Sequence, residues 1–140
     1  MSVRQQNLDT IAPVLATFAV SQTAGVDDLK DSNVGEPVEL TGNNETGPVS
    51  AGGQLLGKLI SLTLSDIDDG ERLATVQVGG VCKLAISATN PVVGNRVIGG
   101  TSGTVKQATA LAGNDPAGGN VARGTVLEVN GSSDCLILLN

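Results

Sequence analysis

The sequence predicts an all-β protein: a small β-barrel or β-sandwich built from two quasi-repeated four-strand units, with an extended N-terminal arm. Three observations predict this class. The 140 residues include 19 glycines and five prolines, a composition that favours many turns over long helices. Short apolar stretches alternate with polar residues at the period of two that a half-buried strand produces. The same order of apolar stretches and polar turns also occurs twice along the chain.

Residues 1–33 precede the repeated part, and their pattern fits two structures. The stretch VLATFAV predicts either a first strand of the barrel, followed by a polar and acidic loop, or part of an arm. An arm would leave the barrel, because an extended apolar segment at a terminus can complete the sheet of a neighbouring molecule. In that case the residues expected to contact the neighbour are Val3, Arg4, Leu8, Ile11, Val14 and Phe18.

Residues 34–140 are expected to form one β-barrel domain that contains the two copies of the repeat, at 34–80 and 93–140. VGEPVEL from 34 and VGNRVIG from 93 share V-G-x-x-V, and each precedes a turn and a second apolar piece, GPV from 47 and GTV from 103. LGKLISLTL from 56 matches RGTVLEV from 123, while LATVQVGG and DCLILLN close the two copies, which VCKLAISATNPV joins. Each copy is a four-strand meander too small to cover its own apolar face, so we expect the two to pack together.

Three turn regions support this division. Asp69-Gly70 and Asn130-Gly131 lie between apolar stretches, and both dipeptides favour the tight turns that connect antiparallel strands. The glycine-dense stretch VGNRVIGGTSGTV lacks the Lys that a phosphate-binding P-loop requires after its last glycine. We therefore interpret it as the opening strand and turn of the second copy.

Few residues could carry chemistry. The sequence contains no histidine, the commonest general base and a frequent metal ligand. Cys82 and Cys135 alternate with aliphatic residues, so we expect two buried free thiols on strands and a reducing compartment at synthesis. We expect no catalytic residue, no cofactor and no enzymatic activity.

One acidic cluster resembles a calcium loop, but its spacing fails at the third acidic position, so a solvated turn is favoured over a metal site. Its members are Asp66, Asp68, Asp69 and Glu71.

The charge limits the partners. The net charge is −6, and the eight basic residues are scattered singly, so neither nucleic acid nor an anionic membrane is an expected partner. Asp9 and Pro13 interrupt the first apolar run, which therefore predicts neither a signal peptide nor a membrane span. We expect synthesis in the cytoplasm.

Taken together, the V-G-x-x-V motif, the glycine-rich turn, VQVGGVCKLAIS, the second V-G-x-x-V in VGNRVIGG and the hydrophobic C-terminal strand define a pattern. Over roughly residues 34–140 it resembles the capsid cement, or head decoration, proteins of tailed bacteriophages, a family formerly known as a phage domain of unknown function. The resemblance implies a virion protein that is made in the bacterial host cytoplasm and binds the outer surface of the mature head. There it would stabilise the capsid by bridging major capsid protein subunits, as a homo-oligomer for which a trimer is favoured over a dimer. Residues 1–33 match no motif of this family.

The alternative is a soluble β-type ligand-binding or carrier module, because two quasi-symmetric four-strand halves also describe biotinyl and lipoyl domains. Those domains carry a modified lysine in a tight hairpin. Lys58 and Lys83 are expected inside strands, which disfavours this alternative.

Overall fold

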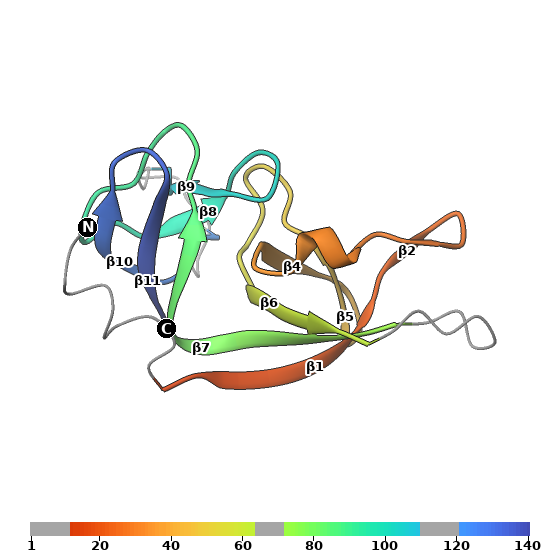
Figure 1. The fold of residues 1–140 in the computed structure, drawn as a ribbon. Helices are drawn as coiled ribbons and strands as arrows, with labels where there is room; N and C mark the ends of the chain where they lie inside the picture. The colour runs from red at the N-terminus through yellow and green to blue at the C-terminus, as the bar shows by residue number, and fades with distance from the viewer. Residues whose placement is uncertain (1–11, 64–71, 110–120) are drawn as a thin grey trace.

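The computed structural model describes residues 12–63, 72–109 and 121–140, and these residues form an all-β fold, as the sequence predicts (Figure 1). A single 3-10 turn, η1 (Asp31–Asn33), interrupts the strands of the described ranges. The strands are β1 (Val14–Val20), β2 (Gln22–Thr23), β3 (Val26–Asp27), β4 (Pro37–Gly42), β5 (Glu45–Pro48), β6 (Gly57–Leu62), β7 (Leu73–Ala85), β8 (Val97–Gly99), β9 (Val105–Gln107), β10 (Thr125–Asn130) and β11 (Asp134–Leu139).

The first unit is a closed five-strand barrel in the order β1-β5-β4-β6-β7. It closes because β1 pairs in parallel with β5 on one edge and antiparallel with β7 on the other. Closure leaves each barrel strand paired on both sides for part of its length. The core of this unit consists of Val20, Leu29, Val38, Leu59, Ala74 and Val76, against which Phe18, Leu56, Leu62 and Val78 pack.

The second unit uses the end of β7 together with β11, β10, β8 and β9. β7 pairs with β11, β11 with β10, and β8 with β9. Two isolated bridges complete the ring: Ile86 pairs in parallel with Val105, and Val97 pairs antiparallel with Arg123. Its core consists of Leu55, Cys82, Leu84, Ile86, Val97, Val105, Val126, Cys135, Ile137 and Leu139.

Strand β7 belongs to both units and bends between them, as Figure 1 shows. Residues up to Gly79 pair with β1, whereas residues from Gly80 onward pair with β11. Gly80 has φ of +87°, a left-handed conformation that glycine adopts without strain. The buried Gln77 amide donates hydrogen bonds of 3.1 Å to the carbonyls of Gly79 and Val81, one on each side of Gly80. A polar side chain thus satisfies the two carbonyls that flank the bend.

The duplication is visible in individual backbone hydrogen bonds. In the first unit the Gly35 amide donates to the Leu59 carbonyl at 2.7 Å, and in the second the Gly94 amide donates to the Val126 carbonyl at 2.8 Å. Both glycines have positive φ, +94° and +90°. A register shift follows Leu59 in the β6–β7 pair and Val126 in the β10–β11 pair. The two copies therefore share their strand pairing and the position of one β-bulge.

The repeat includes a fifth strand in each unit. The Ser21 amide, just after β1, donates to the Thr46 carbonyl at 2.9 Å, and the Ser87 amide, just after β7, donates to the Val105 carbonyl at 3.0 Å. The residue before each serine pairs in parallel with the same partner. β1 thus has the place in the first unit that the end of β7 has in the second.

This fifth strand corrects two expectations. The copies were expected to have four strands each, with residues 1–33 outside the repeat and 81–92 as a joining segment. Instead β1 opens the first copy, and residues 80–85 of β7 open the second. Each copy includes a fifth strand because a barrel with this strand order closes only when one strand lies between the first hairpin and the last strand. In the first unit β1 has this place, between β5 and β7.

Of the two structures that the sequence allows for VLATFAV, the first strand is confirmed and the arm is wrong. β1 is hydrogen-bonded on both edges, so residues 14–20 form a barrel strand and do not leave the barrel. The rest of the predicted arm falls on residues 1–11, which lie outside the described residues.

The expected alignment of GPV from 47 with GTV from 103 is wrong by three residues. The strand pairing equates Val105 with Thr46, and both side chains are fully buried. Val49 corresponds to Ala108, because each donates its amide to the residue before the buried valine of the preceding strand. GPV and GTV have similar sequences, but the structural counterpart of Val105 is Thr46. The methyl group of this threonine takes the place that a valine side chain has in the other core.

Of the predicted hairpins, Asn130-Gly131 is confirmed, since it begins the turn between β10 and β11, in which Asn130 pairs with Asp134. Asp69-Gly70 lies outside the described residues. The stretch at 93–105 contains β8 and a turn in which the Gly100 amide donates to the Thr104 carbonyl at 2.8 Å, as expected.

Candidate functional site

The structure describes two of the six predicted contact residues, Val14 and Phe18, both on β1. Phe18 is partly buried and packs on the first core, whereas Val14 is 57% exposed. In a regular strand two residues four apart face the same side, but a register shift between Val14 and Leu15 breaks this rule. The shift leaves Val14 and Leu15 both exposed at the start of β1. Val3, Arg4, Leu8 and Ile11 lie outside the described residues.

A second apolar surface lies on the second unit, in a pocket of about 800 Å³. Val92 and Val93 are 59% and 64% exposed, and Leu127 opposite them on β10 is 36% exposed. We call this pocket the β10 groove; it is lined by Asn90, Pro91, Val92, Val93, Leu127, Glu128, Val129 and Gly131. The apolar run Pro91-Val92-Val93 could have indicated it, but the expected boundary between the joining segment and the second copy divided this run between Val92 and Val93.

In the first unit, the connection that follows β1 covers the position that corresponds to the β10 groove. Between Ser21 and Val34 it has 12 residues, whereas the second unit has five between Ser87 and Val93. The longer connection carries the fully buried Leu29 into the first core. The buried residue of the shorter connection is Pro91, whose side chain is smaller than that of leucine.

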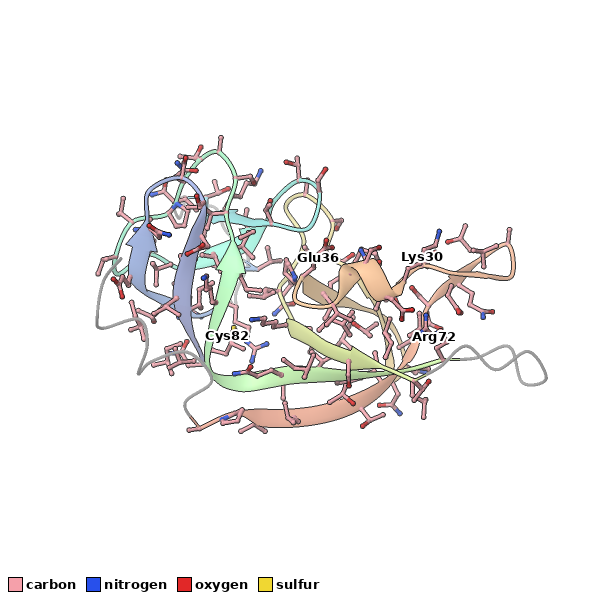
Figure 2. The ribbon with its side chains drawn as sticks, viewed as in Figure 1. Lys30, Glu36, Arg72 and Cys82 are labelled. Carbon is pink, nitrogen blue, oxygen red and sulfur yellow. The ribbon has the colours of Figure 1, made fainter. Side chains whose placement is uncertain are left out.

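An arginine completes this closure. Arg72, at the start of β7, is 7% exposed and donates through Nε to the Thr63 carbonyl and through Nη2 to Asp31 of η1, both at 2.7 Å. Figure 2 shows Arg72 at the end of the first barrel, near the turn that carries Lys30. The repeat places Ser133 at the equivalent position of the second unit, where a serine is too short for this contact.

A second pocket, of about 240 Å³, lies where the two units meet. It is lined by Glu39, Leu40, Gln54, Leu55, Leu56 and Arg123. The Arg123 guanidinium donates to the carbonyls of Leu55, Leu56 and Val78, all in the first unit. Burial lowers the pKa of Arg123 from its ordinary value. Because both of its terminal nitrogens donate to backbone carbonyls of the first unit, Arg123 joins the two units.

The units also meet through backbone groups. The Gly52 amide donates to the Gly99 carbonyl, and the Gly99 amide donates to the Gly53 carbonyl, both at 2.8 Å. A Cβ on Gly99 would lie 2.1 Å from the Ser50 carbonyl oxygen. Only glycine permits this approach, so the contact between units depends on Gly99.

The two thiols match the prediction. Cys82 and Cys135 form no disulfide bond and are fully buried on adjacent strands of the second core, and Figure 2 shows Cys82 on β7 just beyond the bend. Burial, with smaller contributions from Cys82 and Asp134, raises the pKa of the Cys135 thiol to about 12. A buried thiol that stays protonated is a poor nucleophile and metal ligand.

Lys58 and Lys83 lie within β6 and β7, as expected, and not in a hairpin turn of the kind that carrier domains modify. The Lys83 ammonium is 3.8 Å from the Asp134 carboxylate on the paired strand.

Within the described ranges, no three acidic, cysteine or histidine side chains are grouped so that they could hold a metal ion. The acidic cluster of Asp66, Asp68, Asp69 and Glu71 falls outside these ranges. None of the described segments is a helix that is long and apolar enough to cross a membrane.

Comparison with known proteins gives no relative: no family model, curated protein or solved structure matches this chain.

Proposed function

We propose that the protein is a structural component of a tailed-phage virion. It binds the outer surface of the mature head and stabilises the capsid by bridging major capsid protein subunits, and it associates with itself, most simply as a homotrimer. The alternative, a soluble ligand-binding or carrier module, gains no support from Lys58 and Lys83, which lie within strands.

One observation carries this proposal: the described residues form a closed aliphatic barrel and a second ring of strands that share β7, and they leave aliphatic side chains on the surface. Such a body resists deformation, because each strand of the first barrel is paired on both edges and Arg123 joins the units. Exposed aliphatic side chains supply apolar area for contacts between proteins. The resemblance over residues 34–140 points to the same role.

The proposal is tested by adding the purified protein to mature heads that lack a cement protein. We expect saturable co-sedimentation and a higher temperature of head disruption. Absence of binding to any such head would contradict the proposal.

The solution mass tests self-association. Analytical ultracentrifugation at micromolar concentration is expected to show a trimer, and a monomer over the whole accessible range would remove the trimer from the proposal.

The exposed start of β1 gives a residue-level test. Replacing Val14 with Asp is expected to weaken binding to heads by roughly tenfold, since a charge opposes burial of this apolar surface. Val26→Asp is the control, because Val26 is equally exposed, 58% against 57%, but lies in the β2–β3 hairpin. Equal loss in both variants would show that Val14 has no particular part in binding.

A further inference from the structure

The first part of β1 has one strand edge that is open. β1 pairs with β7 from Val14 to Ala19 on one edge, but with β5 only at Ala19 and Val20 on the other. Figure 1 shows β1 at the outer margin of the first barrel. Within the described ranges, no strand, bridge or turn bonds to this second edge before Ala19. The sheet of the first unit therefore ends here in an unpaired strand edge.

The hydrogen bonds at the end of β1 show which backbone groups lie on the open edge. The Val20 amide donates to the Arg72 carbonyl at 3.0 Å, on the side of β7, whereas the Ala19 amide donates at 2.8 Å to the turn between β4 and β5. Successive residues of a strand point their backbone groups to opposite edges, so Thr17 and Leu15 point the same way as Ala19. Each of these two residues presents an N–H donor and a C=O acceptor on the open edge.

The second unit covers the equivalent edge. Val81 has the place of Leu15, because each lies five residues before the residue that makes the parallel pair of its unit. The Val81 carbonyl accepts a hydrogen bond of 3.1 Å from the Gln77 side chain, and Val81 is 7% exposed. Leu15 is 52% exposed, and no described side chain bonds to its carbonyl. The repeat thus closes this edge in one unit and leaves it open in the other.

The surface around the open edge is also uncharged. In the second unit, Lys83 and Asp134 lie 3.8 Å apart on the outer face of the paired strands. The strand pairing puts Thr17 and Leu73 in these places in the first unit, and β1 contains no charged residue. Each chain has a net charge of −6, so two copies repel each other least where the facing surfaces are neutral. This surface therefore suits a second copy of the same chain.

The open edge is complementary to itself. When two copies of β1 run antiparallel about a two-fold axis at Ala16, Leu15 of one copy lies opposite Thr17 of the other. Each free N–H then faces a free C=O on both sides of the axis. The pairing ends beyond these residues, because Pro13 has no N–H and the Ala19 amide is already bonded.

We propose that two copies of this chain join through β1, as antiparallel edge strands about a two-fold axis at Ala16. The contact goes beyond the proposed function, because it names the surface between copies and forms without a head. A two-fold axis does not relate the members of one trimer, so in the proposed assembly the contact joins copies from different trimers. The contact is small, so it forms at high protein concentration.

Sedimentation without heads, from micromolar to millimolar concentration, tests the contact. The mass of the original protein is expected to rise about twofold or more over this range. Thr17→Pro removes the outward N–H and keeps the bonds to β7, so it should weaken the association by about tenfold or more. A mass that stays constant, or that rises equally in Thr17→Pro, would overturn the proposal. Either result leaves the proposed function standing, since that function is measured by binding to heads.

A lysine on the edge gives a second variant with a matched control. Leu15→Lys is expected to weaken the association as Thr17→Pro does, because a charged side chain on an edge strand opposes pairing. The half-exposed position of Leu15 tolerates the change without unfolding. Val26→Lys has the same charge change at a position that is 58% exposed in the β2–β3 hairpin, and it should leave the association unchanged. Equal loss in the two lysine variants would overturn the proposal.

Cysteine cross-linking tests the register. Residues opposite each other in a non-hydrogen-bonded pair have Cα atoms about 4.5 Å apart, within the range of a disulfide. Ala16→Cys should therefore form covalent dimers under mild oxidation. Thr17→Cys is the control, because its Cα would lie roughly 9 Å from that of its own copy, too far for a disulfide. Absence of cross-linking in Ala16→Cys, or equal cross-linking in both variants, would contradict the two-fold axis at Ala16.

A different occupant of the edge would also be recognised. If the mass of the original protein stays constant while Thr17→Pro loses binding to heads, the edge takes a strand of the shell protein, and the proposal of a second copy is wrong.

Discussion

Arg123 shows how a single residue can hold two repeats together. Its counterpart in the first unit is Leu56, because both residues donate their amides to the buried valine of the first hairpin, Val97 or Val38. The long side chain of Arg123 reaches back to three carbonyls of the first unit. The sequence places one scattered cation at this position and gives no sign of this contact, because the acceptors are backbone atoms about 45 to 68 residues away along the chain.

Replacing Arg123 with Met is expected to lower the free energy of unfolding by about 2 to 3 kcal/mol, because half-buried carbonyls lose charged donors. Urea denaturation followed by circular dichroism measures the change. Arg96→Met is the control: Arg96 makes one exposed bond of 3.3 Å to the Ala122 carbonyl, and its loss should cost about 0.5 kcal/mol or less. Equal costs in the two variants would contradict the joining role of Arg123.

The raised pKa of Cys135 predicts that the free energy of unfolding falls in alkaline solution. Its pKa is raised from 9.0 to about 12 in the folded protein, so the unfolded chain releases the thiol proton first as the pH rises. The contribution of this thiol to stability is complete below pH 9 and falls between pH 9 and about 12, by about 1.4 kcal/mol per pH unit. Urea midpoints measured across this range should fall less steeply for Cys135→Ala than for the original protein. Parallel curves would show that the folded thiol titrates normally.

Among the elements, the sequence predicted most of the strands but not the place of the first one. The order of the eight strands from β4 to β11 could be predicted because glycine-rich turns separate alternating apolar stretches. The equivalence of β1 with the end of β7 was visible in principle: Phe18-Ala19-Val20-Ser21 matches Leu84-Ala85-Ile86-Ser87. It was missed because β7 is a continuous strand of 13 residues that crosses the boundary between the units.

The groove could not be predicted in the same way. Its existence depends on the length of one connection and on the exchange of Arg72 for Ser133, and both effects become visible only when the two units are compared residue by residue. The exposure of Val14 likewise depends on a register shift that has no sequence signature here.

Gly57, at the start of β6, tests the close contact of β6 with β7. A Cβ at this position would lie 1.9 Å from the Gln77 carbonyl oxygen, so Gly57→Ala should separate the two strands and cost about 3 kcal/mol of stability. Gly42→Ala, at the end of β4, is the control, because its Cβ would meet only the flexible end of the Glu45 side chain at 3.3 Å. The midpoint of thermal unfolding should be clearly lower for Gly57→Ala than for Gly42→Ala. Similar midpoints would contradict the close approach of the two strands.

At the scale of the whole molecule, the two units form a closed arrangement. The last strand of the first unit runs directly into the first strand of the second through Gly79 and Gly80. The last strand of the second unit, β11, ends where β1 begins. The units therefore meet at two junctions: β7 runs through one without interruption, and at the other the end of β11 faces the start of β1 with no peptide bond between them.

This arrangement predicts that the chain tolerates circular permutation. A protein in which a short linker joins Asn140 to Ala12, and which begins at Gly80 and ends at Gly79, should fold into the same pair of barrels, because the linker only restores the missing junction. Opening the chain between Ala74 and Thr75 is the control, since it cuts a strand that both β1 and β6 need. Circular dichroism and amide exchange should show cooperative folding for the first permutant and not for the second; the reverse result would contradict the closed arrangement.

The most direct test of the account is a crystal structure in which residues 14–79 are superposed on residues 80–139. We predict that the five strands of each unit coincide, with Thr46 on Val105, Val20 on Ile86 and Gly35 on Gly94, and with the β10 groove where the first unit holds Leu29 and Arg72. Two units whose strands fail to superpose in this register would contradict it.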